Sequence, residues 1–367
     1  MLSSTKHDDI RSQKLRKLSR ATSQLDMCMI SYPKACPIAL GRLSARQSSG
    51  GTMMKLPLEL LYNIFSSLEF ESLGKLRLVS YVIKQTVEAM PAFKCMVEHA
   101  STALRALGES NLISEFSAAQ LYQVLRIDRC VGCADYGPFL LLPTIERCCF
   151  NCLTDNLSMR VISTSAAANC FALSTRSFRD IPRLYSIPGE YDGQRRSRRQ
   201  RLVSTRMARE LAVKLHGGED EMKAKVDAKS YRMHTAYLNK RRDWVAMRET
   251  GFDSPFPERP VLPNEVLDLP DDEDPFRYMA STPFPSLNHQ AGSVERGLWC
   301  QGCFEQPSLE ELEAHLHSRS LDVEEGEELV RMSRKAFSEQ EMLDHIDECP
   351  GAQRLWSEFN VSEKSHA

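Results

Sequence analysis

The sequence has no long hydrophobic run. No stretch approaches the roughly 18–20 apolar residues that a membrane-spanning helix needs. At the N-terminus, Asp8, Asp9, Lys14 and Arg16 interrupt any hydrophobic core of a signal peptide. We therefore expect neither a membrane protein nor a secreted one, but a protein of the cytoplasm, the nucleus or both.

The short motifs of common enzyme classes are also missing. The sequence contains no glycine-rich phosphate loop, no nucleophile elbow and no His-Glu-x-x-His pair. Its carboxylates gather in charged runs that are typical of linkers and solvated helix faces. We therefore expect no catalytic residue, and the chain is not predicted to be an enzyme.

Cysteine is abundant by contrast, with twelve in 367 residues, and 42 % of the chain is hydrophobic. The length suggests two or three units at about 100–200 residues per domain. Cysteines without a secretory signal favour metal ligands over a disulfide framework. The net charge of −2 hides strong segregation. Residues 195–248 contain sixteen Lys and Arg against six Asp and Glu, whereas residues 249–295 contain two against ten.

Helical periodicity begins at Leu56. Apolar residues recur every three or four positions, the spacing of amphipathic helices, over 56–68, 73–87, 92–107 and 118–125. Pro57 fits the first position of a helix, where its missing N–H costs nothing. Ser117 and Gln120 have the spacing of a capping box. This part of the chain is predicted to be helical.

The opening Leu56-Pro57-Leu58-Glu59-Leu60 and the later Leu76-Arg77-Leu78-Val79-Ser80 resemble the F-box. The resemblance implies a three-helix unit that docks on the Skp-family adaptor of SCF-type ubiquitin ligases. Such a small unit leaves an apolar face that a partner can cover. The residues expected to bind the adaptor are Leu56, Pro57, Leu58, Glu59, Leu61, Ile64, Phe65, Leu68, Leu73, Leu76 and Val79. The alternative is an ordinary amphipathic hairpin at the start of a globular domain.

A first group of cysteines has the spacing of a zinc site. Cys130-x2-Cys133 is followed, after fifteen residues, by Cys149-x2-Cys152. Two such knuckles can hold one tetrahedral Zn²⁺ with no open position, so the site is predicted to be structural. Cys148 could replace Cys149 as a ligand. A redox pair, a RING-type module and ordinary buried cysteines are the competing interpretations.

A second group lies near the C-terminus. Cys300-x2-Cys303 is separated by 41 residues from His345-x3-Cys349. A spacing of four places the latter two residues on one face of a helix. These four residues are predicted to form a second zinc-finger-like site, whose long insertion does not imply DNA reading.

Two rivals for the histidine ligand, His315 and His317, lie on a helix predicted to begin at Ser308. A helix predicted to begin at Ser338, with Glu341 completing a capping box, should end near Glu348 and favours His345 instead.

The basic cluster at 195–201 could bind phosphate groups or direct nuclear import, although a solvated helix or linker is the simpler interpretation. Aromatic residues are sparse around it, so nucleic-acid binding is not expected to be its role. The alternative function is nevertheless a zinc-binding nucleic-acid or chromatin-associated protein that uses residues 195–248. A thiol redox enzyme acting through Cys130 and Cys133 is a third interpretation.

The sequence thus predicts a mainly α-helical protein with little β-structure, in which a three-helix F-box precedes a helical body stapled by one or two structural Zn²⁺ ions. The order of Cys/His groups resembles a group of fungal F-box proteins. The expected function is a non-catalytic substrate receptor of an SCF ubiquitin ligase that recruits an unknown protein for ubiquitination on other subunits. The predicted parts are a disordered tail (1–54), the F-box (55–97), a helical region with a zinc knuckle (98–190), a basic helical stretch (191–250), an acidic linker (251–296) and a Cys/His unit (297–359).

Overall fold

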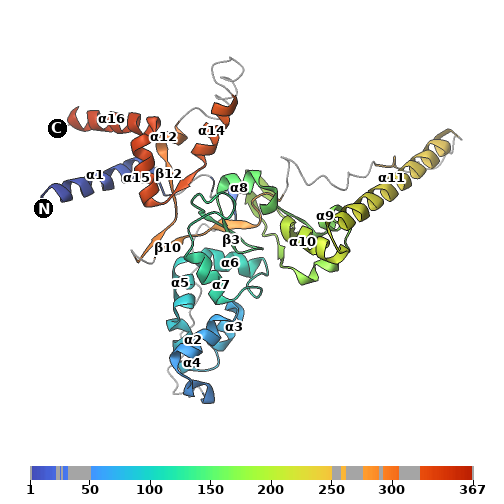
Figure 1. Cartoon of the computed structure of the whole chain (residues 1–367), viewed down its shortest axis with the longest axis horizontal. Helices are drawn as coiled ribbons and strands as arrows, with labels where there is room; N and C mark the ends of the chain where they lie inside the picture. Colours follow the sequence, from blue (N-terminus) through green and yellow to red (C-terminus); the bar gives the residue numbers. More distant parts are fainter. Residues whose placement is uncertain are drawn as a thin grey trace. The chain divides into compact units, whose positions relative to one another are not determined.

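Figure 1 shows the computed structural model of the chain. It describes residues 2–21, 25, 28–31, 51–249, 258–261, 276–288, 292–305 and 323–365. Two compact units share the chain. The first comprises Met1–Asn156, Leu184–Arg199 and Tyr278–Ala367, and the second comprises Leu157–Arg183 and Gln200–Arg277. No helix among the described residues is long and apolar enough to cross a membrane.

Six consecutive helices of the first unit follow the 3-10 turn η2 (Gly51–Lys55). They are α2 (Leu58–Ser66), α3 (Phe70–Leu76), α4 (Tyr81–Ala89), α5 (Pro91–His99), α6 (Ser101–Glu109) and α7 (Ala118–Leu125). The run predicted over 73–87 is interrupted, because the Ser80 hydroxyl accepts the N–H of Ile83 and starts α4. The predicted capping box of Ser117 and Gln120 is confirmed at the start of α7.

These helices share one core. Leu61, Phe65 and Leu73 are buried, and the rings of Phe70 and Phe93 stack with centroids 5.5 Å apart. The backbone N–H of Ala118 donates to the carbonyl of Leu68 at 2.9 Å, which ties α7 to the turn after α2. The three predicted helices of the F-box are therefore continued by further helices rather than by a flexible connection.

A small sheet follows, in the order β3-β2-β9. The central strand β2 (Phe139–Leu141) pairs antiparallel with β3 (Glu146–Cys148) and with β9 (Ser281–Pro283). Arg147 of β3 is buried and donates to the carbonyls of Val124, Gly137 and Phe284, as well as to that of Pro285. Desolvation lowers the pKa of Arg147 to about 10. The guanidinium thereby joins α7, the first cysteine loop and the segment after β9.

The C-terminal part of the first unit surrounds a second small sheet, in the order β1-β12-β13. Its strands are β1 (Ser19–Arg20), β12 (Leu298–Cys300) and β13 (Ala336–Phe337), and its helices are α12 (Gln301–Phe304), α14 (Val323–Ser333), α15 (Glu339–Glu348) and α16 (Pro350–Ser365). The capping box of Ser338 and Glu341 is confirmed at the start of α15.

The predicted disordered tail is wrong for residues 2–21. They form α1 (Leu2–Leu18) and the edge strand β1, in which Ser19 pairs with Cys300. Leu18 is fully buried in the core that contains Cys300 and Cys349. Apolar periodicity failed to reveal α1 because few of its residues are apolar and its stability comes from tertiary contacts.

The predicted helical and linker character of residues 191–296 is also wrong in part. Two hairpins, β6–β7 (Gly189–Tyr191 and Gln194–Arg196) and β10–β11 (Ser286–Asn288 and Ser293–Glu295), belong to the first unit, as does β9. The acidic run 271–274 lies outside the described residues. Strands of three residues are too short to show an alternating pattern.

The second unit has its own core. It contains η3 (Leu157–Met159), β4 (Val161–Ser163), α9 (Thr164–Cys170), η4 (Ser177–Asp180), β8 (Arg201–Ser204), α10 (Thr205–His216) and α11 (Glu219–Glu249), and β5 (Arg183–Tyr185) begins at its boundary. Strands β4 and β8 pair antiparallel, and Phe178, Val203 and Ala212 are buried together. Gly217, with φ of 95°, ends α10 in the left-handed conformation.

The mainly helical class is thus confirmed, but the described residues contain more β-structure than expected. The short strands β3 and β12 lead into the cysteines of the two predicted metal sites.

Candidate metal centres and docking face

The first centre brings together the four cysteines predicted for it. One ligand atom from each of Cys130, Cys133, Cys149 and Cys152 lies within 4.8 Å of the others. The Sγ atoms of Cys133 and Cys149 are 3.5 Å apart. Cys149 precedes α8 (Phe150–Asp155) and accepts the N–H of Cys152, so the N-terminus of that helix faces the centre. Helix N-termini stabilise negative charge such as thiolates.

Cys148 is not part of this group. Its thiol is fully buried in β3, where it donates to the carbonyl of Phe139 at 3.6 Å. Burial raises the pKa of Cys148 well above its usual value. The geometry therefore selects Cys149, and not Cys148, as the first member of the second knuckle.

The second centre brings together Cys300, Cys303, His345 and Cys349, again within 4.8 Å. The Cys303 Sγ lies 3.2 Å from Nε2 of His345 and 3.6 Å from Sγ of Cys349. The Sγ atoms of Cys300 and Cys349 are 3.9 Å apart. His315 and His317 lie outside the described residues.

The donor atoms of both centres fit a tetrahedral metal. Zinc–sulfur bonds of about 2.3 Å place two thiolates of a tetrahedron about 3.8 Å apart. The sulfur–sulfur distances of 3.5, 3.6 and 3.9 Å agree with this edge. They are too long for a disulfide, whose sulfurs are about 2.05 Å apart. Cys/His donor sets suit Zn²⁺ and related soft or borderline cations.

The pKa values of the cysteines in the first centre reflect how close their thiols lie to one another. Hydrogen bonds from Cys149 and Cys152 lower the pKa of Cys130. The same contacts raise the pKa of Cys149 and raise that of Cys152 to about 12. Four adjacent thiols cannot all ionise without a cation, and a bound divalent metal would favour all four thiolates.

In the second centre, hydrogen bonds with Cys300 and Cys303 lower the pKa of Cys349, and those with Cys300 and Cys349 raise that of Cys303. Burial alone would lower the pKa of His345. Its contacts with Cys300 and Cys349 outweigh that effect and raise the value to about 9. The His345 ring also stacks on Phe337, with centroids 4.5 Å apart. This stacking fixes the orientation of the imidazole toward the sulfurs.

Two ion pairs connect the centres. Arg129, next to Cys130, binds Glu341 of α15, the helix that carries His345. Lys335, next to β13, binds Asp135 of the first cysteine loop at 2.8 Å. The two centres are therefore separate donor sets within one connected part of the first unit, and neither shares a ligand with the other.

The residues predicted to bind an adaptor fall into an exposed group and a buried group. Leu58 is 48 % exposed and Val79 67 % exposed, whereas Leu61, Phe65 and Leu73 are buried in the helical core. The outward-facing members of the set are Leu56, Pro57, Leu58, Glu59, Ile64 and Val79, and the partly buried ones are Leu68 and Leu76.

Two further exposed apolar residues were not predicted. Leu60, in α2, is 48 % exposed, and Leu78, in the turn before α4, is 72 % exposed. Six large apolar side chains between residues 56 and 79 are thus open to solvent. We call this set the docking face: Leu56, Leu58, Leu60, Ile64, Leu78 and Val79.

Comparisons of the chain with curated proteins and with solved structures gave no match. One comparison with protein families did: residues 53–92 match the F-box domain. The matched range covers α2, α3 and α4 and includes the entire docking face. The chain therefore contains an F-box domain at residues 53–92.

Proposed function

We propose that the protein is a substrate receptor of an SCF-type ubiquitin ligase. The F-box domain at residues 53–92, with six apolar side chains exposed on it, is the observation that carries this proposal. The docking face binds a Skp-family adaptor, and the rest of the chain holds a protein substrate. Ubiquitin transfer takes place on other subunits inside the cell, in the cytoplasm or the nucleus, and this chain supplies binding and geometry.

Three residues of the predicted adaptor-binding set are buried, so in this proposal they do not contact the adaptor directly. Leu61, Phe65 and Leu73 hold α2 and α3 in the core, so they position the docking face rather than touch the adaptor. Arg77 contributes in the same way, because its guanidinium lies 2.5 Å from the Glu88 carboxylate and fixes the turn that carries Leu78 and Val79.

Both Cys/His groups bind structural Zn²⁺ in this proposal. The support is the donor chemistry and the sulfur–sulfur distances of the two centres. With four protein ligands each, the ions have no open position for substrate or water. Their role is to fix the fold of the first unit.

The basic cluster gives little support to the alternative role in nucleic-acid binding. Arg195 and Arg196 lie in the hairpin β6–β7, Arg199 donates to the carbonyl of Glu109 at 2.5 Å, and Arg201 lies in β8 of the second unit. The cluster is thus divided between elements rather than displayed on one helix face.

Adaptor binding can be tested by co-purification with the double variant Leu58→Glu/Val79→Glu. Both side chains are exposed, so the variant should fold normally while introducing charge into an apolar interface. We expect loss of the Skp-family adaptor, at least tenfold in recovered complex. A matched control is Leu215→Glu in α10, which is 51 % exposed in the second unit. Equal recovery with both variants, or no adaptor with the wild type, would contradict the proposal.

A further inference from the structure

A short N-terminal segment lies against the free edge of β9. The N–H of Ile30 donates to the carbonyl of Ser281 at 3.0 Å, and the hydroxyl of Thr282 donates to the carbonyl of Ile30 at 2.9 Å. Met29 and Ile30 are 1 % and 3 % exposed. One backbone hydrogen bond, one side-chain hydrogen bond and two buried apolar side chains thus hold residues 29 and 30 against this edge.

Strand β9 limits how many backbone hydrogen bonds a segment can form at this edge. The backbone groups of Ala280 and Phe284 bond to the segment that contains β2, so the carbonyl of Ser281 faces the opposite edge. Pro283 has no N–H to offer there. The edge thus recognises only a short stretch of backbone, and neighbouring side chains must supply the remaining specificity.

A cavity of about 660 Å³ lies beside this segment, within the size range of ligand-binding pockets. Its walls are residues 28–31, the end of α6 and the loop and hairpin from Ile187 to Gly193. The hairpin is held rigid, since Asp192 and Gly193 have φ of 49° and 70° in a tight turn. In addition, the hydroxyl of Tyr191 donates to the carbonyl of Ile187 at 2.7 Å.

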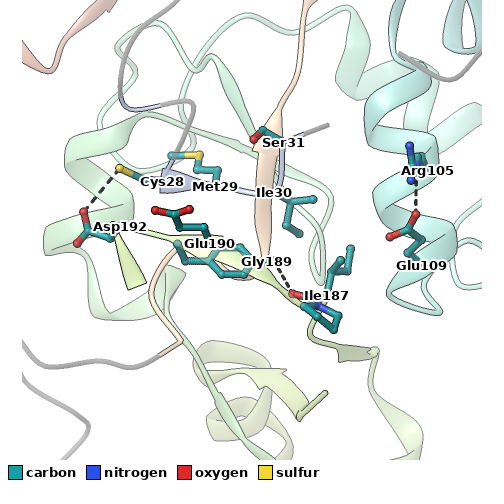
Figure 2. A pocket seen from close by; sticks show the side chains of 13 residues that line it. Cys28, Met29, Ile30, Ser31, Arg105, Glu109, Ile187, Gly189, Glu190 and Asp192 are labelled. Carbon is teal, nitrogen blue, oxygen red and sulfur yellow. Dashed lines mark hydrogen bonds and ion pairs between the residues drawn. The ribbon is translucent and has the colours of Figure 1, made fainter. Parts of the chain in front are cut away.

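The charges on the cavity wall are mainly negative. Figure 2 shows Glu190 and Asp192 beside Cys28 and Met29, with Asp192 joined to Cys28, whose thiol lies 3.7 Å from the carboxylate. Arg105 is paired with Glu109 at 2.8 Å on the other wall. A basic side chain in the position of Cys28 would therefore meet two carboxylates.

We propose that the groove between the edge of β9, the end of α6 and residues 187–193 binds a short segment of the substrate protein, and that residues 28–31 occupy this groove as an intramolecular stand-in. The groove selects a basic residue followed by two apolar residues. The basic residue pairs with Glu190 and Asp192, and the apolar pair replaces Met29 and Ile30. The substrate assignment rests on the proposed receptor function, whereas the peptide chemistry of the groove does not.

The test uses the full chain and a fluorescent peptide with the sequence of residues 25–34. In the wild type the tethered segment competes at an effective concentration on the order of millimolar. The variant Ile30→Asp should release it, so the peptide should bind this variant at least tenfold more tightly than the wild type. The control Ser31→Ala changes an exposed neighbour and should bind like the wild type. A peptide with Arg in place of Cys28 should bind more tightly than one with Glu.

A second measurement covers the case in which Ile30→Asp disturbs the fold, as judged by thermal unfolding. Excess peptide added to the wild type should speed hydrogen exchange at the Ile30 amide, and a peptide with Asp in place of Ile30 should not. If the folded variant binds no peptide, or exchange in the wild type is unchanged, the segment is a fixed part of the fold and the groove proposal is overturned. Adaptor co-purification of the same proteins reports separately on the receptor function.

Discussion

Gly302 and Gly351 lie against each other in the second centre, one within the Cys300-x2-Cys303 knuckle and the other just after Cys349. A Cβ atom on Gly302 would collide with the backbone of Gly351 and Ala352, and a Cβ on Gly351 would collide with the backbone of Gly302. Backbone atoms cannot swing aside as flexible side chains can. The two ligand-bearing turns can approach one metal only because both positions lack a side chain.

The variant Gly302→Ala should therefore separate the two halves of the second centre. We expect a loss of about 3 kcal/mol of unfolding free energy, as for severe overpacking, together with loss of one bound metal. Calorimetry and metal analysis measure the two effects.

Gly108→Ala is the matched control, because a Cβ at this position of α6 meets nothing within 4 Å. It should stabilise the helix by about 1 kcal/mol. If Gly302→Ala kept both metals and the wild-type stability, the close approach of the two turns would not be essential.

At this scale the sequence was informative about the eight Cys and His residues that the structure groups, because knuckle spacing is local chemistry. It was less informative about the docking face. Helical periodicity indicates that Leu58, Leu61 and Phe65 belong to one amphipathic helix. It cannot say that Leu61 and Phe65 face the chain's own core while Leu60 faces solvent, since this depends on where α4 and α7 pack.

Among the elements, α1 has the least expected position. Arg11 donates to the Gln340 side chain at 2.9 Å, and Lys14 forms an ion pair with Asp347, so α1 lies along α15. Its last residue, Leu18, is packed in the core with Cys300 and Cys349. The N-terminal helix thus packs against the second centre, although the two are separated by most of the sequence.

Removal of the buried Leu18 side chain should weaken metal binding at the second centre. Leu18→Ala should cost about 2–5 kcal/mol, as for other buried leucines, and should hasten metal loss to a chelator. Ile10→Ala is a control on the same helix, since Ile10 is 48 % exposed, and it should change stability by less than about 0.5 kcal/mol. Equal rates of metal loss from both variants would show that α1 does not support the centre.

The elements that the sequence missed have a common physical reason. Capping boxes at Ser117 and Ser338 are local and were predicted correctly. Strand β1 has two residues, and its partner β12 is distant in the chain. No local pattern encodes such a pairing, because its stability comes from long-range contacts with residues that periodicity does not relate.

On the scale of the whole molecule, the two units differ in how they are held together. The first unit gathers three separate stretches of chain around two candidate metal centres. Among the described residues of the second unit no candidate metal group occurs. Its core instead packs apolar side chains of β4, β8, α9 and α10.

Removal of metal should therefore open one unit and spare the other. Native mass spectrometry should find about two Zn²⁺ per chain. After chelation, hydrogen exchange should rise at residues 130–152, 298–305 and 336–349, because structural Zn²⁺ contributes on the order of 10 kcal/mol to small metal-bound folds. Amides of β4, β8 and α10 should remain protected, because apolar burial around Phe178 and Val203 does not depend on thiolates. Equal opening of both units would mean that the second depends on the first for its stability, and no change in either would mean that the Cys/His groups do not hold the fold.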